Sequence, residues 1–394
     1  MNRPPVEVAD IVRACSAGFI EKSRRWLHWS HIKVLNAIAR CRTAALGGHR
    51  DQCPQCGHQA ISYNSCRNRH CPKCQMAARD RWVAKRQTEV LPVGYFHVVF
   101  TLPHELSALA LQNKKEIYRL LLQASADTLL EVAANPKHLG AAIGFLSILH
   151  TWGQNLLHHP HVHCVVPSGG ISPDQTRWIH SRPNFLVPVP VLKIVFRAKV
   201  RDGLKRLFRA GKLIFAGQLA ALSNWNAFLA FLEPLCNKEW VVYAKAPFRG
   251  PDHLLQYLAR YTHRVAISNH RLLAFDGGSV TFRWKDYAHG NKKRKMTVSA
   301  DEFLRRFLLH TLPRGFVRIR FFGFLAGPRR SQMLRLARQL LEAAAAHNVP
   351  APIPARASFQ CPICATPMMV VERLSAAKLC PLTGAHWDAL NDSS

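Results

Sequence analysis

Apolar and polar positions follow patterns along the chain that predict helices and strands in mixed order. Between residues 5 and 45 the apolar positions recur at helical spacing among basic residues, which predicts two short helices. A basic helix is expected up to Val90, because Pro92 and Gly94 end it. The aromatic and β-branched stretch 95–102 then predicts a strand, and residues 105–133 predict a long helix.

The second half of the pattern continues in the same mixed way. Residues 143–152 and 162–166 predict two strands joined by a turn rich in His and Pro, so they should pair in one sheet. The later elements are expected as a basic helical region, a strand, a helix, a hairpin and an Ala- and Leu-rich helix, at residues 188–235, 240–244, 254–261, 272–284 and 328–347. Regular βαβ spacing is lacking, which favours an α+β fold with a mostly antiparallel sheet.

Composition shifts divide the chain into three expected parts. Residues 1–92 contain closely spaced cysteines and predict an N-terminal helical zinc-binding domain. Residues 93–327 carry the predicted sheet and are expected to form the catalytic domain. Residues 328–394 predict a C-terminal helix, a Pro-rich linker and a Cys-containing tail with a second zinc knuckle.

The charge balance points to a polyanionic partner. The chain has 54 Lys and Arg against 23 Asp and Glu, a formal charge of +31, and 48% of its 394 residues are hydrophobic, which excludes a wholly disordered protein. Aromatic residues separate the basic ones in 283–295 and 314–330, which favours a nucleic-acid track over ordinary solvated surface. The candidate DNA-binding residues are Arg260, Arg264, Arg283, Lys285, Lys292, Lys293 and Arg294.

The sequence indicates a cytoplasmic protein with reduced thiols. Residues 1–7 lack a charged segment followed by an apolar one, so we expect no secretory signal. The longest stretch without Lys, Arg, Asp or Glu, residues 139–173, is rich in His, Gly and Pro and predicts no membrane span. Twelve cysteines in such a chain therefore indicate metal binding rather than disulfides.

Two Cys-x-x-Cys pairs near the N-terminus predict a structural zinc site. Fourteen residues separate the pairs, a spacing close to that of four-thiolate zinc ribbons, and four thiolates close the shell of the ion. The predicted ligands are Cys53, Cys56, Cys71 and Cys74. Four neighbours could replace one ligand or help to hold a second ion, or could be polar loop residues near DNA: His49, His58, Cys66 and His70.

The C-terminal tail holds a weaker candidate for zinc. Cys361 and Cys364 form another Cys-Pro-x-Cys sequence, with Cys380 and His386 as further candidate ligands. Reduced cysteines without metal are an equally good interpretation of this segment.

A His-x-His sequence supplies a candidate catalytic metal site. His161 and His163 are two residues apart on a predicted strand, so both imidazoles point to the same face. Gln154 lies near the end of the preceding strand, where a tight connection would bring its amide oxygen beside them. Two imidazoles and an amide oxygen suit an exchangeable Mg²⁺ or Mn²⁺ ion. The chain has 21 His, so a chance pair is the alternative.

Two tyrosines supply candidate nucleophiles. Tyr257 and Tyr261 are spaced i, i+4, so on a helix their hydroxyls emerge from one face. Tyrosine ionises at about pH 10 in water, and attack at neutral pH needs a polarised phosphate with nearby cations such as Arg260, His263 or Arg264. The alternative is that both rings are core packing.

Three of these motifs, in this order, carry a resemblance. The runs 62–74, 150–163 and 257–267 resemble the transposases of the insertion-sequence family IS91, and the similarity extends over nearly the whole chain. That family is part of the HUH superfamily, named for His, hydrophobic residue, His. The resemblance implies a four- or five-stranded antiparallel sheet flanked by helices, with the histidines on a central strand and the tyrosines on a facing helix.

The resemblance also implies roles for particular residues. His161 and His163 become metal ligands and Tyr257 and Tyr261 the nucleophiles, with the third ligand variable in the superfamily, so that Gln154, His150 and Gln256 all remain candidates. The implied activity is rolling-circle transposition, in which single-stranded DNA is nicked through a 5′-phosphotyrosine link and rejoined to a target.

Two other classes of protein fit the sequence less well. An acidic-triad transposase needs three clustered carboxylates, and acids are scarce here. A non-catalytic, zinc-containing DNA-binding regulator would need the charge and the cysteines but neither the histidines nor the tyrosines. The expected partners are single- and double-stranded DNA, with no membrane.

Overall fold

The chain folds into two compact units, each assembled from separated segments. The computed structural model describes residues 4–248, 266–286, 290, 292–342 and 359–379. Unit 1 combines residues 1–78, 267–311 and 351–394, and unit 2 combines residues 79–266 and 312–350. This division differs from the three consecutive domains expected from the sequence, because later segments return to pack with the N-terminal ones.

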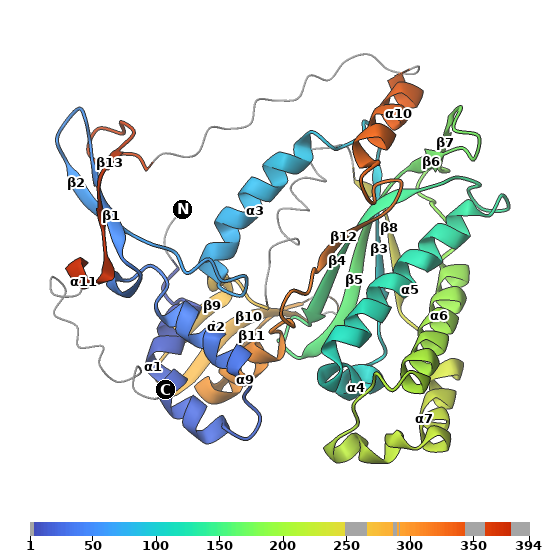
Figure 1. Cartoon of the computed structure of the whole chain (residues 1–394), viewed down its shortest axis with the longest axis horizontal. Coiled ribbons are helices and arrows are strands. Elements are labelled where there is room, and N and C mark those ends of the chain that lie inside the picture. Colours follow the sequence, from blue (N-terminus) through green and yellow to red (C-terminus); the bar gives the residue numbers. More distant parts are fainter. Residues whose placement is uncertain (1–3, 249–265, 287–289, 291, 343–358, 380–394) are drawn as a thin grey trace. The chain divides into compact units, whose positions relative to one another are not determined.

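Unit 2 is built on a five-stranded antiparallel sheet in the order β12-β4-β5-β3-β8 (Figure 1). Its strands are β3 (Tyr95–Thr101), β4 (Gly144–Trp152), β5 (His158–Pro167), β8 (Val242–Phe248) and β12 (Ile319–Gly323). The register places His163 of the central strand β5 opposite Val99 on β3 and Ile148 on β4. The antiparallel pairing predicted for the two strands around the His-Pro turn is therefore present.

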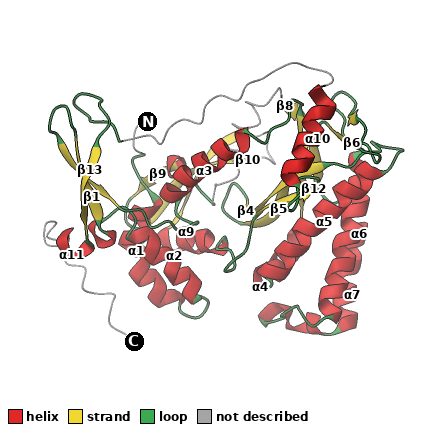
Figure 2. Ribbon diagram, turned by 45° about the horizontal axis from the view of Figure 1, so that its top comes forward, coloured by secondary structure: helices red, strands yellow, loops and turns green. Residues whose placement is uncertain are grey.

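Alternation along the strands gives the sheet two different faces. Phe96, Val98 and Phe100 of β3 share one face with Val162 and Cys164 of β5, and all are buried in the main core of the unit. Helices cover this face (Figure 2): α4 (Ser107–Gln112), α5 (Lys114–Ala134), α6 (Val189–Arg209) and α7 (Trp225–Asn237). The other face holds a smaller cluster with Ile148 and Val165, against α10 (Arg330–Glu342), and it also carries histidines.

The long helix predicted at residues 105–133 is interrupted at Asn113. The backbone of Asn113 leaves the helical region, and its side-chain amide donates to the carbonyl oxygens of Leu109 and Ile214. Asn113 thus ends α4 and begins α5, while its side-chain oxygen accepts from the Ile214 backbone N–H. The remaining small elements of this unit are η2 (His104–Leu106), β6 (Gly169–Ile171), β7 (Trp178–His180) and η3 (Gly217–Ser223).

In its described residues, unit 1 contains two three-stranded sheets and four α-helices that lie wholly within it. The two predicted N-terminal helices are present as α1 (Val8–Ser23) and α2 (Trp29–Ala39), with Ile11, Val12, Leu35 and Ile38 buried. One sheet has the order β11-β10-β9, and the other the order β13-β1-β2. The elements of these sheets and their helices are η1 (Ala44–Leu46), β1 (Gly48–Gln52), β2 (Gln59–Tyr63), η4 (Asn269–Arg271), β9 (Leu272–Phe275), β10 (Ser279–Asp286), β11 (Lys292–Ser299), α9 (Ala300–Leu309), β13 (Met369–Leu374) and α11 (Ala376–Leu379).

A further helix, α3 (Pro72–Gln87), starts in unit 1 and continues into unit 2. Among the described helices, none is long and apolar enough to cross a membrane.

Candidate functional site

Three histidines converge on the face of the five-stranded sheet opposite the main core. His161 and His163 lie on β5, and His150 lies on the neighbouring strand β4 in register with His161. One ring nitrogen from each of the three lies within 4.8 Å of the others, and we call this group the histidine cluster. The His-x-His spacing brings its two imidazoles together on one strand face, and strand pairing adds the third.

Burial determines the charge state of these imidazoles. Desolvation lowers the pKa of His161 to about 4, and it lowers the pKa of His163 well below its ordinary value, with smaller effects from neighbouring histidines. Both rings are therefore neutral at physiological pH, and a neutral imidazole has the lone pair that binds a metal ion. The donor set suits a divalent transition metal.

A fourth histidine contacts the cluster from β3. Nε2 of His97 and Nδ1 of His163 are 2.7 Å apart, and the two ring planes are parallel to within 2°, as an in-plane hydrogen bond between the rings requires. His97 is buried, and desolvation lowers its pKa to about 4, so it too is neutral. His97 could not be identified from the sequence, because a lone histidine in an apolar strand has no local signal for a role in a metal site.

Of the other predicted members of this site, one is described by the structure and the rest lie outside the described residues. Gln154 lies in the turn between β4 and β5, whereas His150 lies within β4. Tyr257, Tyr261 and the rival ligand Gln256 lie outside the described residues, as do Arg260 and Arg264.

A second candidate metal site gathers four cysteines in unit 1. Sγ of Cys74 lies 3.6 Å from Sγ of Cys41 and 3.5 Å from Sγ of Cys66, and Sγ of Cys71 lies 3.6 Å from that of Cys41. We call these residues the Cys41 cluster. Hydrogen bonds from the neighbouring thiols lower the pKa of Cys74, while the same contacts raise the pKa of Cys71, so the thiols share protons unless a cation is present.

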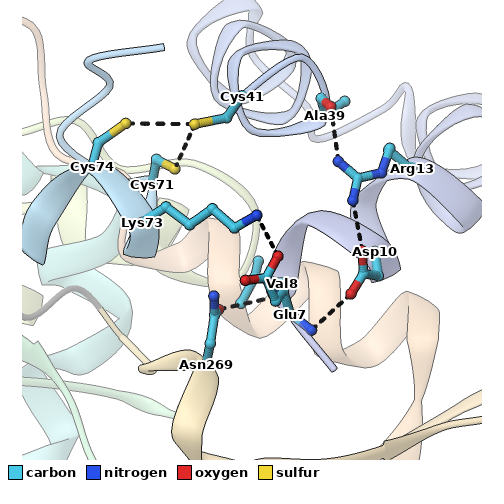
Figure 3. Close-up of polar contacts among 10 residues, drawn as sticks. All are labelled: Glu7, Val8, Asp10, Arg13, Ala39, Cys41, Cys71, Lys73, Cys74 and Asn269. Atoms are coloured by element: carbon cyan, nitrogen blue, oxygen red, sulfur yellow. Dashed lines mark hydrogen bonds and ion pairs between the residues drawn. The ribbon is translucent and has the colours of Figure 1, made fainter. Parts of the chain in front are cut away.

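Figure 3 shows how the N-terminal helices are fixed beside this cluster. Lys73, between two of the cysteines, forms an ion pair with Glu7 at the start of α1. The backbone N–H of Val8 donates to Asn269, and Arg13 joins Asp10 to the carbonyl oxygen of Ala39 at the end of α2. The cysteines and these polar contacts together hold α1, α2 and the start of α3.

The predicted four-cysteine zinc site is distributed over two clusters in the structure. Cys71 and Cys74 group with Cys41 and Cys66, whereas Cys53 and Cys56 group with Cys361 and Cys364 of the C-terminal tail. We call the second group the Cys53 cluster. The grouping expected from spacing thus differs from that in the structure, because three Cys-Pro-x-Cys sequences in the chain are locally equivalent. Cys380 and His386 lie outside the described residues.

The predicted DNA-binding residues that the structure describes lie in one hairpin of unit 1. Arg283 of β10 is opposite Lys295 of β11, and Lys285 is opposite Lys293, on the face where Thr281 contacts Thr297. Like charges directly opposite one another destabilise a sheet, so this face favours an anionic partner. Arg294 points to the other face and pairs with Asp286 at 3.0 Å, and Lys292 is exposed.

Comparison with known proteins adds independent information. Residues 11–102 match the family model described as "Transposase zinc-binding domain", and residues 144–332 match the model described as "Putative transposase". A protein of Sinorhizobium fredii (strain NBRC 101917 / NGR234), "Putative transposase y4qJ", is 51% identical over 385 residues, covering 94% of this chain and 96% of the relative. The chain belongs to the IS91 family of transposases.

A second relative of this transposase is more distant. The "Transposase for insertion sequence element IS801" of Pseudomonas savastanoi pv. phaseolicola is 28% identical over 301 residues, which are 75% of this chain and 70% of the relative. No solved structure was found to match the chain. Within the transposase, the histidine cluster lies in the part matched by the transposase model, whereas His97 and the Cys41 cluster lie within the zinc-binding match.

Proposed function

We propose that this transposase is a rolling-circle enzyme that nicks single-stranded DNA at the ends of its element and rejoins it to a target. The observation that carries the proposal is the histidine cluster, in which three imidazoles occupy one face of a five-stranded antiparallel sheet. Membership of a transposase family supports a DNA substrate. The sheet with His161 and His163 on its central strand supports an HUH-type catalytic domain.

In the proposed reaction, the hydroxyl of Tyr257 or Tyr261 attacks the scissile phosphate in line. An O–P bond to the tyrosine forms as the phenol loses its proton, and the bond to the 3′ oxygen breaks, leaving a 5′-phosphotyrosine and a 3′-OH. Arg260 and Arg264 are the proposed cations beside the tyrosines. A divalent ion held by the histidine cluster would polarise the phosphate and stabilise its developing charge. Rejoining reverses the step with a target 3′-OH, so it needs no ATP.

His97 is proposed to orient His163 toward the ion. If Nε2 of His163 binds the metal through its lone pair, Nδ1 must carry the hydrogen, and it then donates to Nε2 of His97, 2.7 Å away. The contact would fix both the tautomer and the ring plane of His163. Such outer partners of ligating histidines make metal binding stronger and more selective.

The third protein ligand separates two versions of the site. His150 supplies a third imidazole, whereas Gln154 would supply an oxygen. Three imidazoles favour Mn²⁺ over Mg²⁺, because Mg²⁺ prefers oxygen ligands. We therefore expect His150→Ala to raise the metal concentration needed for cleavage much more than Gln154→Ala; the reverse result would make Gln154 the ligand.

Zinc is the proposed structural cofactor at the Cys41 cluster. Four thiolates would close the coordination shell, which excludes substrate from the ion. The proposed DNA contacts are Arg260, Arg264 and the basic hairpin with Arg283, Lys285, Lys292, Lys293 and Arg294. Double-stranded target DNA would bind through the same excess of positive charge.

Covalent trapping tests the proposed chemistry directly. The purified full chain is mixed with Mg²⁺ or Mn²⁺ and a tiled set of labelled single-stranded oligonucleotides from the element ends, and adducts are resolved on a denaturing gel. Wild type should give an adduct, and the Tyr257→Phe, Tyr261→Phe double variant should bind DNA without forming it. Tyr243→Phe is the matched control, because exposed Tyr243 lies opposite Val99 on the face that carries the histidine cluster.

Two outcomes of this assay would contradict the proposal. Binding by wild type without any adduct would favour a zinc-containing DNA-binding regulator. Loss of the adduct in Tyr243→Phe alone would assign the nucleophile to a different tyrosine.

A further inference from the structure

Two turns from opposite ends of the chain have the same local structure. In the first, the backbone N–H of Gly57 donates to the carbonyl oxygen of Cys53 at 3.0 Å, and the N–H of Cys53 donates to His58 at 2.8 Å. In the second, Ala365 donates to Cys361 at 2.9 Å and Cys361 donates to Thr366 at 2.9 Å. Each turn is therefore a Cys-Pro-x-Cys knuckle closed by the same pair of hydrogen bonds.

The residue after each knuckle has the same unusual backbone conformation. Gly57 has φ +73° and Ala365 has φ +58°. The left-handed region is unfavourable for an alanine, so Ala365 occupies it only because the surrounding turn requires it. A turn of this type points both of its sulfurs to one side.

The sulfurs of the two knuckles meet at one point. Sγ of Cys53 lies 3.4 Å from that of Cys364, and Sγ of Cys56 lies 3.5 Å from that of Cys361 and 3.7 Å from that of Cys364. All four lie within 4.8 Å of one another. A zinc ion with bonds of about 2.3 Å to four sulfurs gives a tetrahedron with edges of about 3.8 Å, which these separations approach. They are much longer than a disulfide bond of about 2.05 Å.

Beyond the knuckles, the N-terminal and C-terminal segments also pair with each other as strands. β13 pairs with β1 in an antiparallel register that sets Gly48 opposite Leu374, and Figure 1 shows these two strands side by side. A Cβ atom at Gly47, where φ is +69°, would lie 2.6 Å from the carbonyl oxygen of Leu374. Gly47 thus permits an approach of the C-terminal strand that no other residue allows without a shift of the backbone.

We infer that Cys53, Cys56, Cys361 and Cys364 bind one zinc ion and form a zinc ribbon assembled from both ends of the chain. The two knuckles supply the ligands, and β13, β1 and β2 supply the three-stranded sheet. The C-terminal tail is then an integral part of the zinc-binding unit, with a metal ion as the link. The inference stands apart from the proposed nicking chemistry.

Counting zinc in cysteine variants of the full chain tests this pairing. We expect about two ions per chain in wild type, one for each four-cysteine cluster. Cys361→Ser with Cys364→Ser should remove one ion, and Cys53→Ser with Cys56→Ser should remove the same one. The quadruple variant should therefore still hold one ion, at the Cys41 cluster. The readout is metal analysis by mass spectrometry after gel filtration.

The quadruple variant distinguishes the inference from a ribbon made within the N-terminal segment. If Cys53 and Cys56 shared an ion with Cys71 and Cys74, while the tail held its own, all zinc would be lost from the quadruple variant and the inference would be wrong. It would also be wrong if Cys361→Ser with Cys364→Ser kept both ions. Cys236→Ser is the control, since Cys236 belongs to neither cluster, and it should keep both.

Thiol labelling gives a second readout if a variant folds poorly. In Cys361→Ser with Cys364→Ser, an alkylating reagent should modify Cys53 and Cys56, while Cys71 and Cys74 remain protected as an internal reference for folding. Protection of all four would overturn the inference. Modification of all four, in a chain that still elutes as wild type, would also overturn the inference. Cys53 and Cys56 would then lose protection together with Cys71 and Cys74, as members of one site.

Discussion

The Cys41 cluster and the histidine cluster differ in the number of ligands that they offer to a metal ion. Four sulfurs surround a single point in the first, and three of those cysteines are buried, so a bound ion has no position left for substrate. The second offers three imidazoles from two strands, which leaves positions for water and phosphate. The number of protein ligands would separate a structural ion from the proposed catalytic one.

The two clusters also differ in what holds their ligands. The cysteines of the Cys41 cluster come from the end of α2, an irregular loop and the start of α3, and strand pairing does not join these described segments. The histidines lie on paired strands whose backbone hydrogen bonds and core packing fix them without an ion. Loss of metal should therefore unfold the first region and leave the second folded.

The largest effect is expected from Cys71→Ser with Cys74→Ser. Structural zinc contributes about 10–16 kcal/mol in small zinc-finger peptides, so its loss should release α1 and α2 from protection. Hydrogen exchange at the buried residues Val34, Leu35 and Ile38 should rise by several orders of magnitude, while exchange along β5 stays slow. Unchanged protection of α2 would remove the distinction between the two clusters.

Next in size is the effect of His161→Ala. We expect covalent adduct to fall below detection, because one ligand of the proposed catalytic ion is lost. The free energy of unfolding should change by about 1 kcal/mol or less, since His161 is only half-buried and its strand keeps its pairing. Denaturant unfolding and adduct formation measure the two effects, with His180→Ala on β7 as the control for both.

A smaller effect is expected at His97. His97→Phe removes the acceptor for Nδ1 of His163, so the Mn²⁺ concentration giving half-maximal adduct should rise by about 10- to 100-fold. His97→Gln retains an oxygen acceptor and should restore much of that loss. If both variants needed the same metal concentration as wild type, His97 would be a packing residue with no role in metal binding.

The smallest effect is expected in the basic hairpin. Lys293→Ala and Lys295→Ala should each reduce the slope of log affinity against log salt by about one, because each removes one phosphate contact. Neither should lower stability, since both relieve a like-charge pair across β10 and β11. Lys199→Ala on α6, where Lys199 pairs with Glu131, is the control and should leave the salt slope unchanged.

The elements that the sequence predicts well are those that are stabilised by burial of their own apolar side chains. β3, β4 and β5 are dense in aromatic and β-branched residues, and alternation along them places His161 and His163 on one face. From the sequence, His150 is only an alternative to Gln154 as the third metal ligand, because the choice between them depends on the register between β4 and β5. Register is a long-range property that the local pattern does not contain.

The elements that sequence missed are stabilised mainly by partners far along the chain. β1, β2 and β13 are polar or exposed along much of their length, so they have no clear period and exist through mutual pairing. Cys41 has no cysteine within three residues and gave no knuckle signal. Since the three Cys-Pro-x-Cys sequences look alike, only tertiary structure distinguishes the partner of each.

The pairing of β1 with β13 sets an order of events during biosynthesis. Cys56 is synthesised 305 residues before Cys361. At about 5–20 residues per second, the early knuckle waits about 15–60 s for its counterpart. Until β13 has been translated, its place beside β1 is empty, and any product terminated before β13 would keep that edge exposed.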